Sequence, residues 1–159
     1  MAQNHEYCPQ NHRGRPSQNP VWVFGLCDIS TKPALGYMEI VPARDAATLL
    51  PIIQDHVHPG TIIWSDCWAA YSGVGALPSV QGHSTVNHSI EFVAPSGTHT
   101  NHIESYWNRI KTKLKRMRGC HRSQLASYLD EFMWRERYGK NCLDTLDNLY
   151  DSIARWYPE

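Results

Sequence analysis

The sequence has no excess of charge of either sign, because 15 Lys and Arg residues balance 15 Asp and Glu residues. A role in binding nucleic acid therefore cannot be argued from the net charge. No stretch approaches about 18 consecutive apolar residues, the length that a membrane-spanning helix needs. The first residues contain no apolar run of the signal-peptide type. We therefore expect neither a membrane span nor a secretory signal.

Cysteine is also scarce, with five residues and no Cys-x-x-Cys motif. An odd number of scattered cysteines favours free, mostly buried thiols in a reducing, intracellular compartment over a disulfide framework. What the chain does contain is an ordinary globular composition, 42% hydrophobic over 159 residues. This is enough for one domain with a core of its own.

Apolar runs and turn residues predict the order of the elements. Residues 1–20 are polar and rich in Pro, Asn, Gln and His, so we expect an extended tail there. Continuous apolar runs at 21–29 and 37–42, separated by turn residues, predict a hairpin of two strands. The next expected elements are a helix over 46–57 capped by Asp45, a buried strand at 61–66, a short helix within 67–74 and a strand within 83–93. Three helices should follow: a basic helix after residue 100, a helix capped by Ser123 and ended by Gly139, and a final helix. The apolar face of the final helix carries Leu143, Leu146, Leu149, Ile153 and Trp156. This order implies an α/β sheet with a helical C-terminal flank.

The segment HTNHIESYWNRIKTKLKRMRG (99–119) places one acid at the start of a strongly basic helix. At about 100° per residue, one helical face carries Glu104, Asn108, Lys111, Lys115 and Arg118. The apolar face beside it should pack against the core and carries Ile103, Trp107, Ile110, Leu114 and Met117. The charged face has two interpretations. It is either a solvated surface that suits the helix dipole, or a metal-binding carboxylate on a helix that also binds a polyanion, and helical spacing leaves both open.

A second acid, Asp66, ends the predicted strand at 61–66. In open α/β sheets, ligands bind at the carboxyl ends of strands. Two carboxylates that converge there suit a hard divalent cation. Two such ions, about 3.5–4 Å apart, clamp the attacking and leaving oxygens of a phosphodiester. The plain alternative is that Asp66 caps the short helix that follows, and spacing does not decide between them.

Four segments carry a resemblance to a known family: PIIQDHVHPGTIIWSDCWAAY, TVNHSIEFV, GTHTNHIESYWNRIK and YLDEFMWRERY, in this order. From about Arg13 to Pro158 the chain resembles the DDE transposase domain of ISXO-type bacterial insertion sequences and of the related Merlin transposons of animals. The resemblance implies a ribonuclease H-like mixed sheet with flanking helices, and an enzyme that cuts and joins DNA with Mg²⁺ or Mn²⁺. It implies DNA as the partner, no small-molecule substrate and no membrane. The expected location is the nucleus in a eukaryote, or the cytoplasm or nucleoid in a bacterium.

The resemblance also assigns roles to residues. The family's second and third acids fall on Asp66, in SDCWAAY, and on Glu104, in HTNHIE. Both are therefore expected to be catalytic metal ligands. The basic helix is expected to contact DNA phosphates, with little sequence information. The residues expected to make these contacts are Lys111, Lys113, Lys115, Arg116 and Arg118.

One part of the family pattern has no match. The family begins with a strand that carries the first Asp, upstream of a basic Arg-Gly-Arg. Arg13-Gly14-Arg15 is present, but residues 1–12 contain no Asp and no apolar strand, and Glu6 is their one acid. We therefore expect a tail over 1–20 and a transposase domain over 21–158, truncated so that its first strand and first metal ligand are missing. The strand at 21–29 would then have one unpaired edge, which predicts poor solubility or self-association through that edge.

These observations predict a transposase-derived domain whose catalytic triad is incomplete. The alternative is a non-enzymatic nucleic-acid-binding module that uses the basic helix over 104–118. A third interpretation, a purely structural interaction protein, depends on the aromatic C-terminal helices. Metal-dependent nicking would favour the enzyme, whereas salt-sensitive binding without metal would favour the module.

Overall fold

A computed structural model describes residues 2–7, 21–87, 99–139 and 141–157, with the backbone alone for 2–7. At its centre is a five-stranded mixed sheet in the order β3-β2-β1-β4-β5. The strands are β1 (Ala2–Tyr7), β2 (Val21–Asp28), β3 (Leu35–Val41), β4 (Thr61–Asp66) and β5 (Val80–Val86). β1, β2 and β3 are antiparallel neighbours, whereas β4 runs parallel to both β1 and β5.

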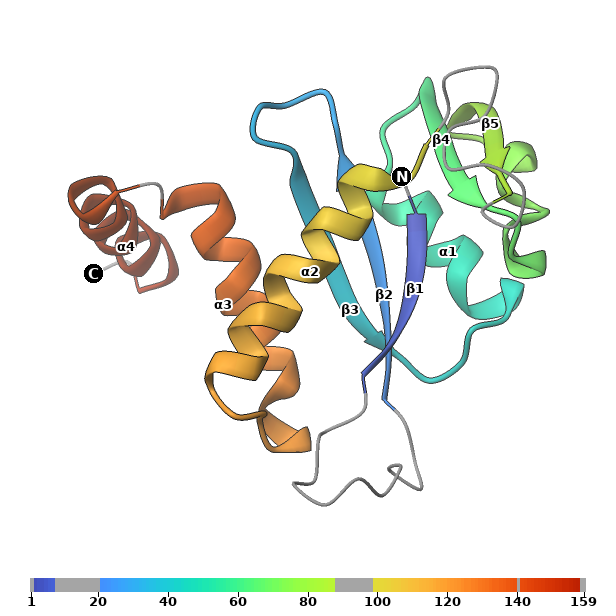
Figure 1. The fold of residues 1–159 in the computed structure, drawn as a ribbon. Helices are drawn as coiled ribbons and strands as arrows, with labels where there is room; N and C mark the ends of the chain where they lie inside the picture. Colours follow the sequence, from blue (N-terminus) through green and yellow to red (C-terminus); the bar gives the residue numbers. More distant parts are fainter. Residues whose placement is uncertain (1, 8–20, 88–98, 140, 158–159) are drawn as a thin grey trace.

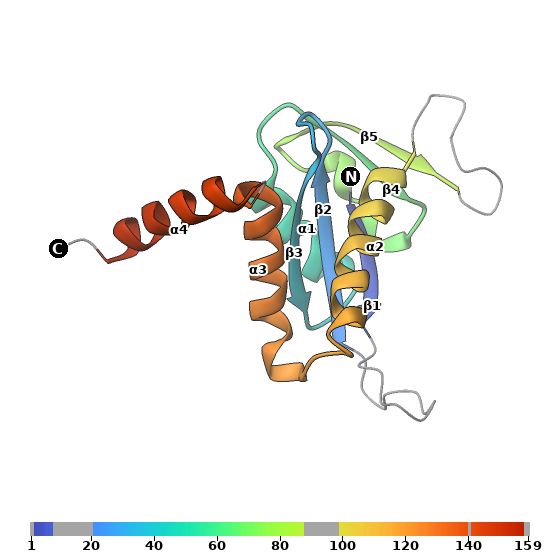
Figure 2. The same cartoon turned by 60° about the vertical axis from the view of Figure 1, so that its left-hand side comes forward.

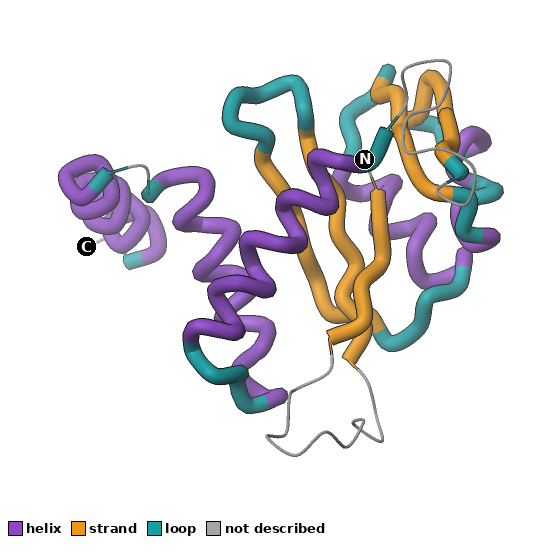
Figure 3. The backbone as a smooth tube through the Cα atoms, in the orientation of Figure 1, coloured by secondary structure: helices purple, strands orange, loops and turns teal. Residues whose placement is uncertain are grey.

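Helices lie on both faces of this sheet (Figures 1 and 3). They are α1 (Ala46–His56), α2 (Asn101–Arg116), α3 (Leu125–Tyr138) and α4 (Cys142–Trp156), with three short 3-10 turns, η1 (Ala69–Tyr71), η2 (Val74–Ala76) and η3 (Arg122–Gln124). The mixed α/β class expected from the sequence is confirmed.

Two hydrophobic cores form because successive side chains of a strand point to opposite faces. Val23 and Cys27 of β2 pack with α2 and α3. Phe24 and Leu26 pack on the other face with α1 and η1. The predicted apolar face of α2 is confirmed as far as Leu114. The residues of that face that are buried are Ile103, Trp107, Ile110 and Leu114, whereas Met117 lies beyond the end of the helix and is 38% exposed.

Several predicted elements occur where the sequence places them. β2 and β3 form the hairpin, and β4 has the predicted bounds. The Asp45 carboxylate caps α1 by accepting a hydrogen bond from the Thr48 backbone N–H at 2.9 Å. Gly139 ends α3, but Ser123 does not cap it. Ser123 lies inside η3, and α3 begins after it with Gln124 at the N-cap.

The N-terminal segment contradicts two expectations. Residues 2–7 are not part of a tail but form β1 at the centre of the sheet, so the first strand is not missing. β2 pairs with β1 on one side and with β3 on the other, so the expected unpaired edge is wrong too. β1 pairs with β2 along its whole length and with β4 at Ala2. Backbone hydrogen bonds of this kind do not depend on side chains, so a strand can form from the polar sequence AQNHEY, which has no apolar pattern to reveal it. Residues 8–20 lie outside the described residues.

Three other expectations need correction. Among the described cysteines, Cys27 is buried, but Cys67 and Cys142 are exposed free thiols. The short helix predicted within 67–74 is a pair of 3-10 turns, η1 and η2. The predicted strand within 83–93 begins earlier, as β5, and residues 88–93 lie outside the described part. In the described ranges, no helix has the length and apolarity to cross a membrane.

Candidate metal and nucleic-acid site

Asp66 is the last residue of β4 and is half-buried. Its Oδ1 accepts a hydrogen bond from the Trp68 backbone N–H at 3.0 Å. This bond spans two residues, as in an Asx turn, and redirects the chain as it leaves the strand. The N-cap of η1 is Trp68, so Asp66 is not the N-cap of the turn that follows β4.

Glu104 lies in the first turn of α2 and is also half-buried. Its Oε1 accepts a hydrogen bond from the Thr100 hydroxyl at 3.0 Å, and its backbone N–H donates to the Thr100 carbonyl at 3.1 Å. Because Thr100 is fully buried, these bonds fix the carboxylate against the domain. The position also suits an anion, because the start of a helix carries partial positive charge.

Aromatic contacts bring the start of α2 to β4. His99, directly before the helix, meets the Trp64 ring edge to face, with ring centroids 5.7 Å apart. Trp64 is two residues before Asp66 and therefore shares its face of the strand. The ring centroids of His99 and His102 are 5.4 Å apart. Figures 1 and 2 both show the first turn of α2 beside the start of β1. The structure thus joins the two segments that carry the predicted acids.

A pair of carboxylates fits the chemistry of Mg²⁺. This ion is commonly held by one or two carboxylates, while waters and substrate phosphates supply the other oxygens. Within the described ranges, no group of three or more His, Cys, Asp or Glu side chains could hold a metal ion. The binding of a metal ion by Asp66 and Glu104 stays a prediction.

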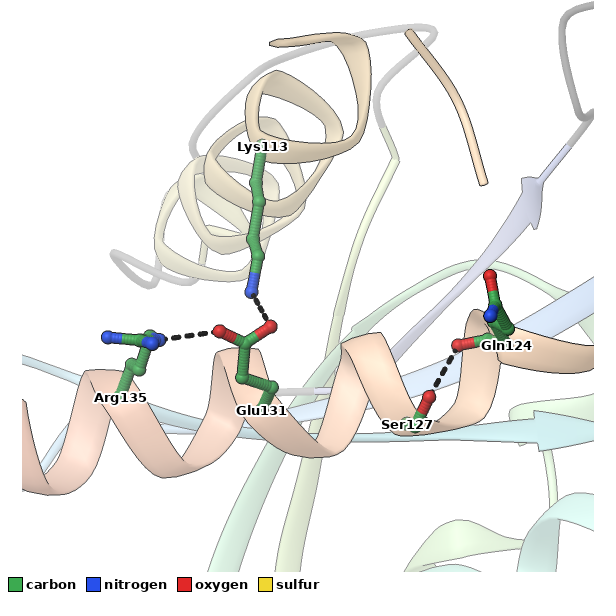
Figure 4. A network of polar contacts seen from close by, with 5 residues as sticks. All are labelled: Lys113, Gln124, Ser127, Glu131 and Arg135. Carbon is green, nitrogen blue, oxygen red and sulfur yellow. Dashed lines mark hydrogen bonds and ion pairs between the residues drawn. The ribbon is translucent and has the colours of Figure 1, made fainter. Parts of the chain in front are cut away.

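The cations of α2 divide into two groups, and the first faces α3. Arg109 forms an ion pair with Glu136. Lys113 Nζ lies 2.7 Å from Glu131 Oε2, and Arg135 Nε lies 2.6 Å from Glu131 Oε1 (Figure 4). The hydrogen bonds from Lys113 and Arg135 hold the pKa of Glu131 below its ordinary value, so it stays ionised at neutral pH. Lys113, one of the predicted DNA contacts, is thus engaged with α3.

The second group lies toward the end of α2. Lys115 and Arg116 are exposed, and Lys111 is half-buried one turn before Lys115. Burial, and then the positive charge of Lys115, lower the pKa of Lys111. Like charges one helical turn apart repel each other by about 0.2–0.5 kcal/mol. An anion bound between two such cations would offset this repulsion.

Arg118 departs from the predicted stripe. α2 ends at Arg116, and Arg118 has a φ of 60° in the turn that follows. Gly119 continues this turn with a φ of 91°, and its N–H donates to the Leu114 carbonyl at 2.8 Å. This is a typical left-handed helix end. Arg118 is exposed near the basic end of α2, but it does not share the helical face of Glu104.

Beside Asp66 lies a stack of side chains that the sequence reasoning missed. The Arg44 guanidinium carbon lies 3.6 Å from the centroid of the Trp22 ring and 4.9 Å from that of the Trp68 ring. The Trp68 indole N–H donates to the Arg44 carbonyl at 3.2 Å. The same turn buries Tyr71, whose pKa is raised by burial and then by the charge of Asp66. These residues come from separate elements, so no local pattern in the sequence could reveal the stack.

The fold and the site define a mixed α/β domain in which two acids and a basic helix are associated with one sheet. The chain belongs to the family of ISXO2-like transposase domains, which matches residues 2–137. It is also 34% identical over 99 residues to a transposase-like protein of Haemophilus influenzae that is itself uncharacterized, covering 62% of this chain and 78% of that protein. No solved structure matches the chain. The family match includes β1 and ends before α4.

Proposed function

We propose that this chain is a DNA-binding domain of transposase origin that holds one divalent cation but does not complete DNA cleavage. Its family supports a connection with DNA transposition. The mixed sheet order supports a ribonuclease H-like fold, as the resemblance implies. The likeness to Merlin transposons is part of the same proposal. Asp66 and Glu104 are the proposed ligands of Mg²⁺ or Mn²⁺, which when bound would stabilise charge on phosphate oxygens.

The pairing register of β1 is the observation that supports an incomplete metal site. Ala2 lies opposite Ser65, so the next backbone position along β1, Gln3, is level with Asp66. β1 contains no aspartate, and its one acid, Glu6, lies three residues further on. At about 3.3 Å per residue this is about 10 Å along the strand. Because a two-ion clamp has its ions about 3.5–4 Å apart, this displacement supports a site for one ion.

The proposed DNA contacts lie at the basic end of α2. They are Lys111, Lys115, Arg116 and Arg118, with a smaller contribution from Lys113 because Glu131 already neutralises it. These contacts go to phosphates, so binding should be indifferent to sequence and should fall steeply with salt.

The second candidate is a nucleic-acid-binding module that has no use for metal. It is favoured by the distance between the two parts of the site. Arg116 lies 12 residues after Glu104 on the same helix, which is about 18 Å at 1.5 Å per residue. The basic end can therefore contact phosphates without an ion at the acids. DNA affinity that is the same with and without Mn²⁺, together with no bound ion, would favour this module.

Metal binding by the whole chain tests the proposal. Mn²⁺ is titrated into the protein, and the free ion is measured by electron paramagnetic resonance. We expect one bound ion, weakened by Asp66→Asn and by Glu104→Gln. The matched control is Asp55→Asn, which removes one carboxylate charge from an exposed position on α1. No bound Mn²⁺, or equal weakening by the control, would show that the two acids are not a metal site.

A further inference from the structure

The helix α4 contacts the domain through its polar side. Thr145, Asn148 and Ser152 are its half-buried residues, and every other residue from Cys142 to Tyr157 is exposed. These three lie along one side of the helix, at spacings of three and four residues. The Asn148 side-chain amide donates to the Tyr138 carbonyl at the end of α3, at 2.9 Å. This contact turns the opposite side of α4 away from the chain.

That opposite side is apolar and open. In Figures 1 and 2, α4 projects away from the sheet and from α2. Its apolar stripe consists of Leu143 (76% exposed), Leu146 (47%), Tyr150 (62%), Ile153 (48%) and Tyr157 (79%), and it is flanked by Leu149 (44%) and Trp156 (82%), one helical turn after Thr145 and Ser152. An amphipathic helix normally buries such a stripe, and a contiguous exposed apolar patch marks an interaction surface.

We propose that the apolar stripe of α4 pairs antiparallel with the same stripe of a second copy of this chain. The steps between Leu143, Leu146, Tyr150, Ile153 and Tyr157 alternate between three and four residues, as in a coiled-coil seam. An antiparallel pair centred on Tyr150 sets Leu143 against Tyr157 of the second copy and brings Leu146 within one residue of the level of its Ile153. The stripe is therefore complementary to itself under a two-fold axis, which a closed dimer requires.

Charge favours the antiparallel direction. Three acids, Asp144, Asp147 and Asp151, are spread along α4, and the basic residue of its last turn is Arg155. A parallel pair would set each of the three acids level with its own copy. The antiparallel pair moves the copies of Asp144 and Asp147 apart, leaves Asp151 near its own copy, and opposes the two helix dipoles.

The exposed area is a substantial part of what a stable contact needs. Tyr150 and Tyr157 each offer about 150–250 Å² when fully buried, and roughly 70% of that is open here. These two alone provide on the order of 300 Å², more than a third of the 800 Å² per partner in a standard interface. The three aliphatic residues of the stripe extend the contact along the helix.

The mass of the full chain in solution tests the proposal. Light scattering after size exclusion should give twice the 18.2 kDa of one chain. The double variant Leu146→Glu/Ile153→Glu should weaken the dimer by more than about tenfold, by analytical ultracentrifugation. It should keep the near-ultraviolet circular dichroism of the domain, because neither residue is buried. The matched control, Arg155→Glu, makes the same change of charge at an exposed position on the polar side of α4, away from the apolar stripe, and should remain a dimer. A monomeric wild-type chain, or a dimer that survives the double variant, overturns the proposal.

Disulfide trapping tests whether the two α4 helices pair antiparallel. In a Cys67→Ser/Cys142→Ser background, Tyr150→Cys should form an intermolecular disulfide under mild oxidation, because position 150 meets its own copy. Leu143→Cys should not, because an antiparallel pair separates the two copies of position 143 by about 21 Å, well beyond disulfide reach. Trapping at 143 and not at 150 would overturn the antiparallel arrangement.

Discussion

Replacing Lys111, Lys115 and Arg118 together by alanine should weaken DNA binding and flatten its dependence on salt. Each phosphate contact contributes about −0.9 to the slope of log K against log salt concentration, so three lost contacts change that slope by up to about three units. Between 50 and 200 mM salt, each contact accounts for a loss of about 3.5-fold, and three contacts for roughly 40-fold. The structure makes this an upper limit, because Lys111 is half-buried and Arg118 lies in the turn after the helix.

The assay is fluorescence anisotropy of a labelled DNA duplex over that range of salt. The matched control is Arg109→Ala/Lys113→Ala/Arg135→Ala, which removes the same number of positive charges from side chains that already pair with Glu136 or Glu131. We expect the control to keep most of the wild-type slope. If both triple variants flatten the slope equally, the DNA is responding to the total charge of the protein, and the assignment to the end of α2 is refuted.

Three further predictions follow from single residues. A Cβ on Gly36 would lie 2.1 Å from the buried Tyr106 ring. Gly36→Ala should therefore lower the free energy of unfolding, measured by urea denaturation, by about 1–3 kcal/mol. In the control Gly82→Ala the nearest neighbour of the new Cβ would be Ile62 at 3.9 Å, so this change should have little effect. Burial lowers the pKa of His83 below its ordinary value of 6.5. The unfolded chain therefore binds more protons, and the thermal midpoint should fall as the pH drops below about 6.5, less so in His83→Gln. Glu131→Gln should release Lys113 for DNA, steepening the salt slope by up to about one unit. Because its ion pairs with Lys113 and Arg135 are partly open to solvent, the loss of stability should be about 1 kcal/mol. An unchanged slope would show that Lys113 is out of reach of DNA.

The elements that the sequence predicted well share a physical basis. β4 is an apolar run bounded by Pro-Gly on one side and by an acid on the other. α1 has both an apolar stripe and an Asp45 cap with the expected hydrogen bond. In each case the local pattern and the tertiary environment favour the same structure, so a reading of the sequence alone is sufficient.

What the sequence alone did not reveal depends on neighbouring elements of the fold. β1 has no apolar signal, and pairing with β2 and β4 makes it a strand. The apolar stripe of α4 was predicted correctly as a pattern, but the pattern does not say what covers it, and in this structure the polar side contacts α3. Periodicity identifies a face of a helix, whereas the neighbour of that face depends on the tertiary fold.

The candidate site was predictable only in part. The family resemblance predicts Asp66 and Glu104 as site residues, which stays a prediction, and the structure brings their segments into contact through Trp64 and His99. Helical spacing could not show that Lys113 pairs with Glu131, because that partner lies on another helix. It also could not show that α2 ends before Arg118, since the left-handed turn there depends on Gly119.

Nicking of supercoiled plasmid DNA in Mn²⁺ tests the central claim most directly, because that claim separates DNA binding from cleavage. Binding is verified in the same samples by gel shift, so that a protein that does not bind DNA is not mistaken for one that binds without cleaving it. The account predicts that the whole chain forms no more nicked product than its Glu104→Gln variant does, while both bind DNA. Nicking that Asp66→Asn and Glu104→Gln abolish would contradict the account, and its loss in Glu6→Gln as well would identify Glu6 as the third ligand.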